Sequence, residues 1–226
     1  MSAVGSDDQP PQGVTMSFKE IKDKRVKKTL SLKEENKKIV DDYSEQIAKK
    51  NKQVLKEKDI KWDIEHDAYL EIFYDCLTDI LANTWETIED IYGVDTKKKE
   101  SITTADIDKL TYSKDGLTLS KRLAKYFKEY SKHIPTIERM LYDLMRILNT
   151  EAMCVMNNGI RTKLKDDFTY ALVEEAECCD ICLDYMSEGL VLLDDFEEPP
   201  YHPNCECIAV EFTEEEAKEM DINIGE

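Results

Sequence analysis

Two short stretches near the end of the chain decide how this part of the molecule folds: Glu177-Cys-Cys-Asp-Ile-Cys182 and His202-Pro-Asn-Cys-Glu-Cys207. The first holds a Cys-x2-Cys pair, Cys179 and Cys182, and the second, about twenty residues later, holds one histidine and two cysteines. Two thiolates on a tight turn can reach one small cation, and a second short cluster can complete a tetrahedron around it. Because four protein ligands leave no open position for water, the pattern predicts a structural zinc site rather than a catalytic one.

The ligands that we expect for the zinc ion are two residues from each stretch: Cys179, Cys182, His202 and Cys205. Cys207 is an alternate, since it can take the place of His202. Pro203 and Asn204 favour a turn that points the ligands of the second stretch in the same direction.

The other three cysteines are not expected to bind the ion. Cys178 is adjacent to Cys179 and should point away, whereas Cys76 and Cys154 lie in apolar helical patterns and should be core residues. Disulfides are the weaker interpretation, because the total of seven cysteines is odd and residues 1–11 lack the apolar core of a secretory signal. Five of the seven cysteines lie within thirty residues, with a histidine at ligand spacing, which favours a metal site over ordinary buried cysteines.

The charge of the chain is unevenly distributed. The 226 residues carry a net charge of −18 and suffice for one domain or two small ones. Residues 18–58 contain fourteen lysines and arginines against eight acidic residues, whereas residues 171–226 contain one lysine against eighteen. We therefore expect the two ends to face different surroundings. Phosphates would repel the acidic end, while the basic end is a solvated lysine-rich helix or a contact for DNA or an acidic protein.

The hydrophobic pattern predicts a mostly α fold, in which a helical body of about 150 residues leads into a small C-terminal zinc-stapled α+β module. Helices are expected over residues 31–58, 63–90, 104–110, 120–133 and 137–157. Strands are expected over residues 168–173 and 208–212, where they would flank the metal loops as an antiparallel sheet. No apolar run approaches the length of a membrane span.

Local signals place several ends of these helices. Gly93 is a C-cap for the second helix, and Thr136 is the N-cap of the long helix that follows Pro135. Asn157-Asn158-Gly159 is interpreted as the stop of that helix. Thr213 fits a capping box that opens a short final helix.

Two further stretches precede the Cys/His ending: Asp115-Gly-Leu-Thr-Leu-Ser-Lys-Arg122 and Arg146-Ile-Leu-Asn-Thr-Glu151. In this order the three resemble the Mu F-like phage head morphogenesis proteins, also called minor head or minor capsid proteins. The patterns of that family are Gly-x-x-Leu-Ser-x-Arg, Arg-Thr-Glu, and Cys-x2-Cys followed by His-Pro-Asn-Cys-Arg-Cys. The last pattern is the specific one. Asn149 and Glu206 depart from the family, which usually has arginine at both positions. The first hundred residues carry no part of the resemblance.

The resemblance implies a structural virion component of a tailed phage, made in the host cytoplasm and bound to the portal vertex inside the capsid. It implies a role in head assembly or in genome packaging and ejection. The partners would be the portal protein and also a major capsid or scaffolding protein, with non-specific contact between the basic N-terminal region and packaged DNA. The expected division is a flexible tail over residues 1–30, a helical portal-binding region over 31–112, and a Mu F-like domain over 113–226. The metal module of that domain is expected at about 168–212.

Two other classes of function compete with this one. A nuclease would need histidines outside the staple, but the chain has only His66, His133 and His202, and the first two are interpreted as surface residues. Glu151 could imitate the catalytic glutamate of an ADP-ribosyltransferase, although a locally paired helix residue is favoured. None of the seven glycines belongs to a phosphate-binding loop, so the expectation is a protein that is not an enzyme. A cellular zinc-ribbon adaptor is the remaining alternative.

Overall fold

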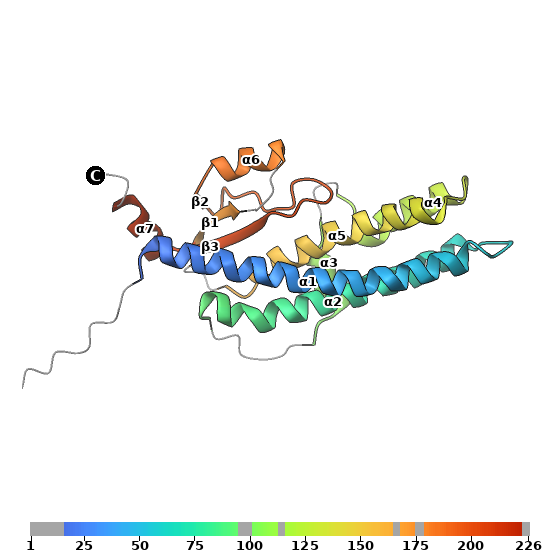
Figure 1. Cartoon of the computed structure of the whole chain (residues 1–226), viewed down its shortest axis with the longest axis horizontal. Helices are drawn as coiled ribbons and strands as arrows, with labels where there is room; N and C mark the ends of the chain where they lie inside the picture. Colours follow the sequence, from blue (N-terminus) through green and yellow to red (C-terminus); the bar gives the residue numbers. More distant parts are fainter. Residues whose placement is uncertain (1–15, 95–100, 113–115, 165–167, 175–178, 223–226) are drawn as a thin grey trace, which may run out of the picture.

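The chain, in a computed structural model, is mostly helical and carries one small antiparallel sheet (Figure 1). The structure describes residues 16–94, 101–112, 116–164, 168–174 and 179–222. Within these ranges the elements are α1 (Phe18–Val54), α2 (Trp62–Tyr92), α3 (Thr104–Leu110), α4 (Leu119–Tyr130), α5 (Ile137–Arg161), β1 (Phe168–Glu174), α6 (Asp180–Ser187), β2 (Val191–Leu192), β3 (Ile208–Thr213) and α7 (Glu214–Ile222). The predicted fold class, a helical body with a small α+β end that bears the cysteine cluster, is confirmed.

The first helix begins earlier than predicted. Ser17 and Glu20 form a capping box, in which each side chain accepts a hydrogen bond from the other residue's backbone N–H, and α1 starts at Phe18. The ring of Phe18 packs against that of Phe212 in β3, with 5.0 Å between centroids. The assignment of residues 1–30 to a flexible tail is therefore wrong from residue 18 onward, because a distant strand covers the start of the helix. Residues 1–15 lie outside the described residues.

The helices α2 and α5 cross closely at one glycine. The predicted helix over 63–90 is confirmed as α2, which ends at Gly93 with φ 71°. The predicted stop at residues 157–159 is wrong, since α5 continues to Arg161. Gly159 lies against α2, where Trp85 Nε1 donates to its carbonyl oxygen at 3.1 Å. Here glycine serves close helix packing, and this tertiary contact outweighs its tendency to end a helix.

Replacing Gly159 with alanine should lower the free energy of unfolding by about 1 kcal/mol, measured by urea denaturation. The new Cβ would lie 2.7 Å from Leu81 Cδ1, and Leu81 is fully buried. Overpacking costs about 1–3 kcal/mol, while the better helix propensity of alanine returns up to about 1 kcal/mol. In a Leu81→Ala background the same change should be neutral or stabilising. An equal loss in both backgrounds would contradict the contact.

The sheet has the order β2-β1-β3, with both pairings antiparallel. Strands β1 and β3 are the two that the sequence predicts, and Leu172 lies opposite Val210 in their register. Phe168, Leu172, Ile208, Val210 and Phe212 belong to the same hydrophobic core as the helices. The sheet is thus anchored on the helical body and shares its hydrophobic core. The capping box at Thr213 and Glu216, which opens α7, is also confirmed.

The basic first helix and the acidic C-terminal region lie side by side, as Figure 1 shows for α1 and α7. Three ion pairs join them: Lys22–Glu174, Arg25–Glu216 and Lys33–Glu206. The expectation that the two charged ends face different surroundings is therefore wrong. Some of the basic residues of α1 pair with acidic residues of the C-terminal region within the same fold. None of the described helices combines the length and the apolar character that crossing a membrane requires.

Candidate metal centre and the helix cluster beside it

The five candidate ligands are brought together by α6 and by the loop before β3. Cys179 is the N-cap residue of α6, and Cys182 lies in its first turn. The helix α6, which the sequence prediction treated as loop, therefore presents both thiols in one direction. Cys205 N donates to His202 O at 3.0 Å, which confirms the predicted turn. Asn204 takes a left-handed conformation in this turn, with φ 62°, as asparagine tolerates better than most residues.

Four of the distances among the candidate ligand atoms are close to those around a bound zinc ion. His202 Nε2 lies 3.1 Å from Cys179 Sγ and 3.2 Å from Cys182 Sγ. Cys182 Sγ lies 3.5 Å from Cys179 Sγ and 3.6 Å from Cys205 Sγ. Ligand atoms around a zinc ion with ordinary bond lengths are separated by about 3.5–3.8 Å. Binding of the ion through all four predicted ligands would need Cys205 to approach Cys179 or His202 more closely, since these do not all lie within one 4.8 Å group.

Two overlapping groups of candidate ligands share Cys182. One holds Cys179, Cys182 and His202, and the other holds Cys182, Cys205 and Cys207, with all ligand atoms of a group within 4.8 Å of one another. The cluster could therefore bind a metal ion such as zinc through three cysteines and a histidine or through four cysteines. The choice between His202 and Cys207 stays open in this geometry.

The orientation of the imidazole favours His202 as a ligand. Its Nδ1 lies 3.0 Å from the carbonyl oxygen of Pro203, so Nδ1 is the nitrogen that carries the proton and donates. The other ring nitrogen, Nε2, faces the thiols of Cys179 and Cys182 and is the one available to a metal ion. Histidines that bind metals characteristically donate their other ring N–H to a carbonyl or carboxylate, which fixes the tautomer.

The thiols of the cluster differ in acidity. A hydrogen bond from the side chain of Cys207 lowers the pKa of Cys205 to about 5, whereas burial raises the pKa of Cys182 to about 12. Cys179 is the N-cap of α6 without a side-chain capping hydrogen bond. The nearby backbone N–H of Cys182 nevertheless lowers the pKa of the Cys179 thiol. Because a coordinated thiol loses its proton outright, a bound divalent cation would replace the protons that these groups now share.

The apolar cluster around the thiols is small. Its buried members are Val173 and the three cysteines 182, 205 and 207, and it is separate from the main core. The rings of Tyr185 and Tyr201 stack beside it at 3.7 Å between centroids, with an interplanar angle of 1°. So few buried residues contribute little hydrophobic stabilisation, which is the situation in which small modules depend on a metal.

Side chains of α5 hold the metal-bearing segment in place. Asn157 donates from Nδ2 to Cys207 O at 3.2 Å and accepts from Ala209 N at 3.3 Å, so it bridges the residues that lead into β3. Thr150 Oγ1 accepts from Asn204 N at 3.2 Å. Asn157, which the sequence analysis interpreted as part of a helix stop, is thus a buried residue inside α5 that binds the backbone before β3.

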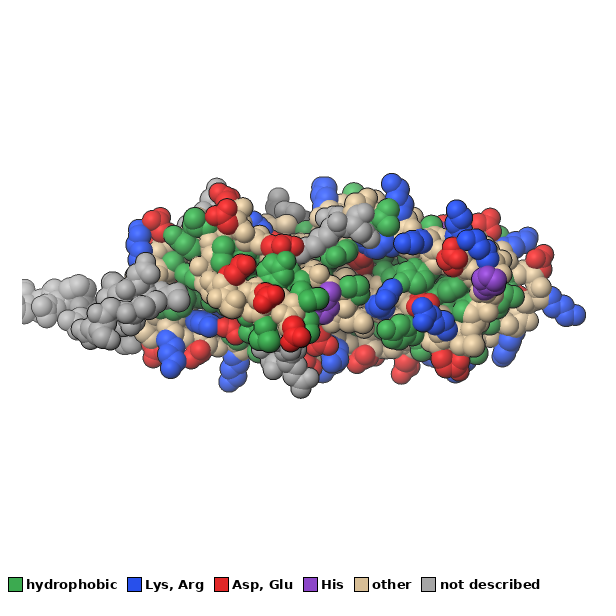
Figure 2. Space-filling model, turned by 90° about the horizontal axis from the view of Figure 1, so that it is seen from above, with side chains coloured by type: hydrophobic (Ala, Val, Ile, Leu, Met, Phe, Trp, Pro, Cys, Tyr) green, Lys and Arg blue, Asp and Glu red, His purple; other side chains and the backbone are tan. Residues whose placement is uncertain are grey.

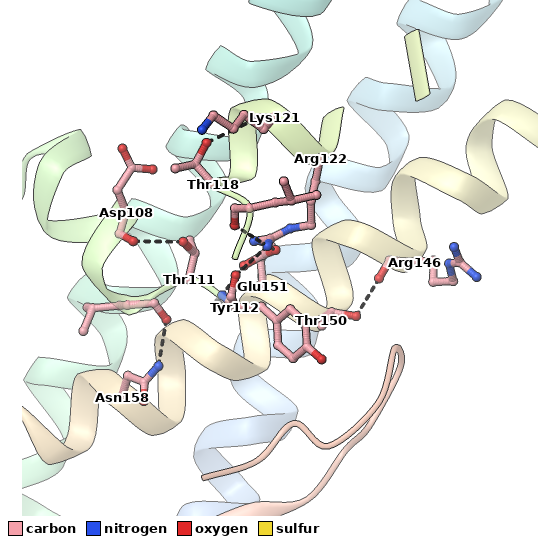
Figure 3. Close-up of polar contacts among 12 residues, drawn as sticks. Asp108, Thr111, Tyr112, Thr118, Lys121, Arg122, Arg146, Thr150, Glu151 and Asn158 are labelled. Atoms are coloured by element: carbon pink, nitrogen blue, oxygen red, sulfur yellow. Dashed lines mark hydrogen bonds and ion pairs between the residues drawn. The ribbon is translucent and has the colours of Figure 1, made fainter. Parts of the chain in front are cut away.

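Beside the metal-bearing loop, α4 and α5 are joined by a buried ion pair (Figure 3). The guanidinium of Arg122 contacts the carboxylate of Glu151, and the two side chains are only 11% and 1% exposed. Glu151 also accepts from the backbone N–H of Tyr112 at 2.8 Å, while Arg122 donates to Leu117 O at 2.7 Å. Glu151 is therefore a paired carboxylate, but its partner lies on another helix and not nearby in the sequence, where the sequence analysis placed it. The sequence prediction did not foresee that Arg122 is its partner.

The other cysteines and histidines differ in burial. Cys76 and Cys154 are buried, which confirms them as core residues, while Cys178 lies outside the described residues. His133 is exposed as expected. His66 is only 14% exposed at its side chain and lies with Nε2 3.0 Å from Ser120 O, so its interpretation as a surface residue is wrong.

The residue between the last two cysteines connects the metal-bearing loop to α1. This residue is Glu206, and its carboxylate lies 2.9 Å from Lys33 Nζ. Lys33 also donates to Glu206 O at 3.0 Å. An arginine at this position would meet a buried lysine, whereas glutamate attaches the loop to α1. This pairing also lowers the pKa of Glu206.

Comparison of the chain with known protein families, with curated proteins and with solved structures gives no match.

The metal content of two variants should decide the fourth ligand. His202→Ala should lose tightly bound zinc, whereas Cys207→Ala should retain one zinc ion per chain. Removal of an outer-shell partner lowers metal affinity about 10–100-fold, and loss of the ligand His202 should lower zinc affinity by more than that. Zinc affinity is measured by competition with a chromogenic chelator. The opposite pattern would make Cys207 the fourth ligand.

Proposed function

We propose that this protein is a structural minor head protein of a tailed phage or related virus, of the Mu F-like kind, bound to the portal vertex on the inner side of the capsid. In this role it acts in head assembly or in genome packaging and ejection, by binding and not by turnover. The proposal is supported by one observation: the three stretches that resemble that family contact one another in the structure.

The meeting involves direct contacts between residues far apart in the sequence. Arg122 of the first stretch pairs with Glu151 of the second, and Thr150 of the second accepts from Asn204 of the third. Pro203 of the third lines the same hollow as Arg122 and Glu151. A likeness confined to the order of amino acids would not require these side chains to touch, so the contacts support a shared structural element.

The metal fits this function as a staple. It would hold α6 and the loop before β3, whose own apolar cluster is small, against a helical body with a large core. A zinc ion with four protein ligands adds rigidity without offering a position to substrate. This suits a protein that must keep one shape within an assembly.

The portal contact is proposed at the end of the helical body that lies away from the sheet. Ile64, Ile134 and Tyr142 are each more than half exposed there, close to the start of α2 and the start of α5 (Figure 1). Exposed apolar side chains that gather at one end of a molecule mark a contact surface. Contacts with a major capsid or scaffolding protein, and of α1 with packaged DNA, are further expectations of the same role.

Co-purification with the cognate portal protein tests the proposal. The full chain should associate with portal rings, and Ile64→Lys together with Ile134→Lys should weaken the association. Ile181→Lys, which places the same charge on the exposed side of α6, is the matched control and should bind normally. Failure of the unmodified chain to associate with the portal under assembly conditions would overturn the proposal.

A further inference from the structure

A small hollow lies between α4, α5 and the turn at Pro203. It has a volume of about 200 Å³, and Arg122, Lys125, Arg146, Tyr126 and Tyr112 are among its lining residues. Figure 3 shows Arg122, Tyr112 and Glu151 together at one side of this region, with Arg146 further along α5. The hollow therefore collects three cationic side chains from two helices.

The cations of this hollow are not cancelled by acidic neighbours. Glu151, which is buried, already pairs with Arg122. Arg146 contacts the hydroxyl of Tyr126, and among the residues that the structure describes no carboxylate pairs with Arg146 or Lys125. Among the lining residues that the structure describes, Lys125 and Arg146 thus add two positive charges beside the Arg122–Glu151 pair.

The surroundings of the hollow are also basic, in contrast to the chain as a whole. Residues 116–149 contain seven lysines and arginines against three acidic residues, while the net charge of the protein is −18. In Figure 2 the Lys and Arg side chains gather over the half of the visible face that lies away from α6. A local positive field on an acidic protein attracts small anions to that place.

The geometry points to a phosphate group as the ligand of this hollow. A phosphate monoester carries about −1.5 to −2 charges at neutral pH and three strong acceptor oxygens, which match two uncompensated cations and the phenol of Tyr126. A carboxylate carries one charge and two oxygens and leaves one cation uncompensated. Guanidinium groups such as that of Arg146 bind phosphate through two parallel hydrogen bonds. The hollow contains none of the candidate metal ligands and none of the residues proposed for the portal contact, although Pro203 of the metal-bearing loop lines it.

The inference is tested by isothermal titration of the full chain with inorganic phosphate. One phosphate should bind per chain, and both Arg146→Gln and Lys125→Gln should weaken binding about tenfold, the effect of one charge-assisted hydrogen bond. Lys128→Gln removes the same charge from α4 outside the hollow and is the matched control. Lys125 is exposed, so its substitution leaves the fold intact even if that of Arg146 disturbs α5.

Two further titrations identify the source of the phosphate. Displacement of inorganic phosphate by short duplex DNA, at an equal concentration of phosphate groups, assigns the site to a nucleic-acid backbone. No displacement assigns it to free phosphate or a small phosphate ester, and either result supports the site. Absence of saturable binding, an equal effect of Lys128→Gln, or equally tight binding of acetate would overturn the inference.

Discussion

Replacing Arg122 with methionine should lower the free energy of unfolding by about 3–5 kcal/mol, because it breaks a buried ion pair. The substitution removes the guanidinium but leaves Glu151, which is 1% exposed, as a buried carboxylate without its ion-pair partner. The cost of burying that carboxylate is then no longer offset by Coulombic attraction to Arg122. Urea denaturation followed by circular dichroism measures the change.

Two variants make this prediction specific. The double variant Arg122→Met with Glu151→Met removes both charges and fills similar volume, so it should recover most of the stability that the single variant loses. Lys132→Met breaks an ion pair with Glu129 in which both side chains are exposed, and it should cost at most about 0.5 kcal/mol. If the single and double variants lose the same stability, the ion pair is not what supports this part of the fold.

Removal of the metal should release α6 and the loop before β3 while leaving the sheet and α2 in place. The reason is the division of apolar contacts: β1 and β3 contribute to the main core, whereas the cysteine cluster is small and separate. Free zinc at 100 times its dissociation constant stabilises the folded segment by about 2.7 kcal/mol. Chelation removes this stabilisation and so raises the equilibrium constant for local opening about a hundredfold. Amide hydrogen exchange over residues 179–206 should accelerate accordingly.

The variant Cys182→Ser should reproduce the effect of chelation, because Cys182 belongs to both groups of candidate ligands. Cys76→Ala, which changes a buried cysteine of α2, should retain the metal and leave exchange over residues 179–206 slow. Unchanged protection of residues 179–206 after metal removal would contradict the staple. Simultaneous loss of protection in β1 and β3 would contradict the division between the two clusters.

The features that the sequence predicts well are those with local causes. The apolar stripe of α2, the cap at Gly93, the Thr213 capping box and the ligand spacing around Cys179 each depend on residues a few positions apart. The two strands β1 and β3 are likewise predicted from the β-forming residue types within each short segment.

The features that it misses depend on contacts between distant segments. The early start of α1 is supported by Phe212, 194 positions from Phe18 by the numbering of the chain. The continuation of α5 through Gly159 depends on Trp85 in α2. Even so, Ser17-Phe-Lys-Glu20 is a capping-box pattern that could have placed the start of α1 correctly.

The site shows the same division. The five candidate metal ligands are recognisable because their residue types and spacing are specific. The contact of Arg122 with Glu151 is not, because arginine and glutamate are common on helices and the two lie 29 positions apart. The hollow with Lys125 and Arg146 could have been suspected only from the local excess of cations on an otherwise acidic chain.

Three residues within eight positions of α5 make different long-range contacts. Thr150 contacts the metal-bearing loop, Glu151 pairs with Arg122 of α4, and Asn157 binds the residues that lead into β3. Each added or deleted residue turns the following part of a helix by about 100°. A single insertion after Glu151 would carry Asn157 away from β3 while leaving Thr150 in register. Relatives of this protein should therefore keep a constant length here and concentrate their insertions and deletions between the helices.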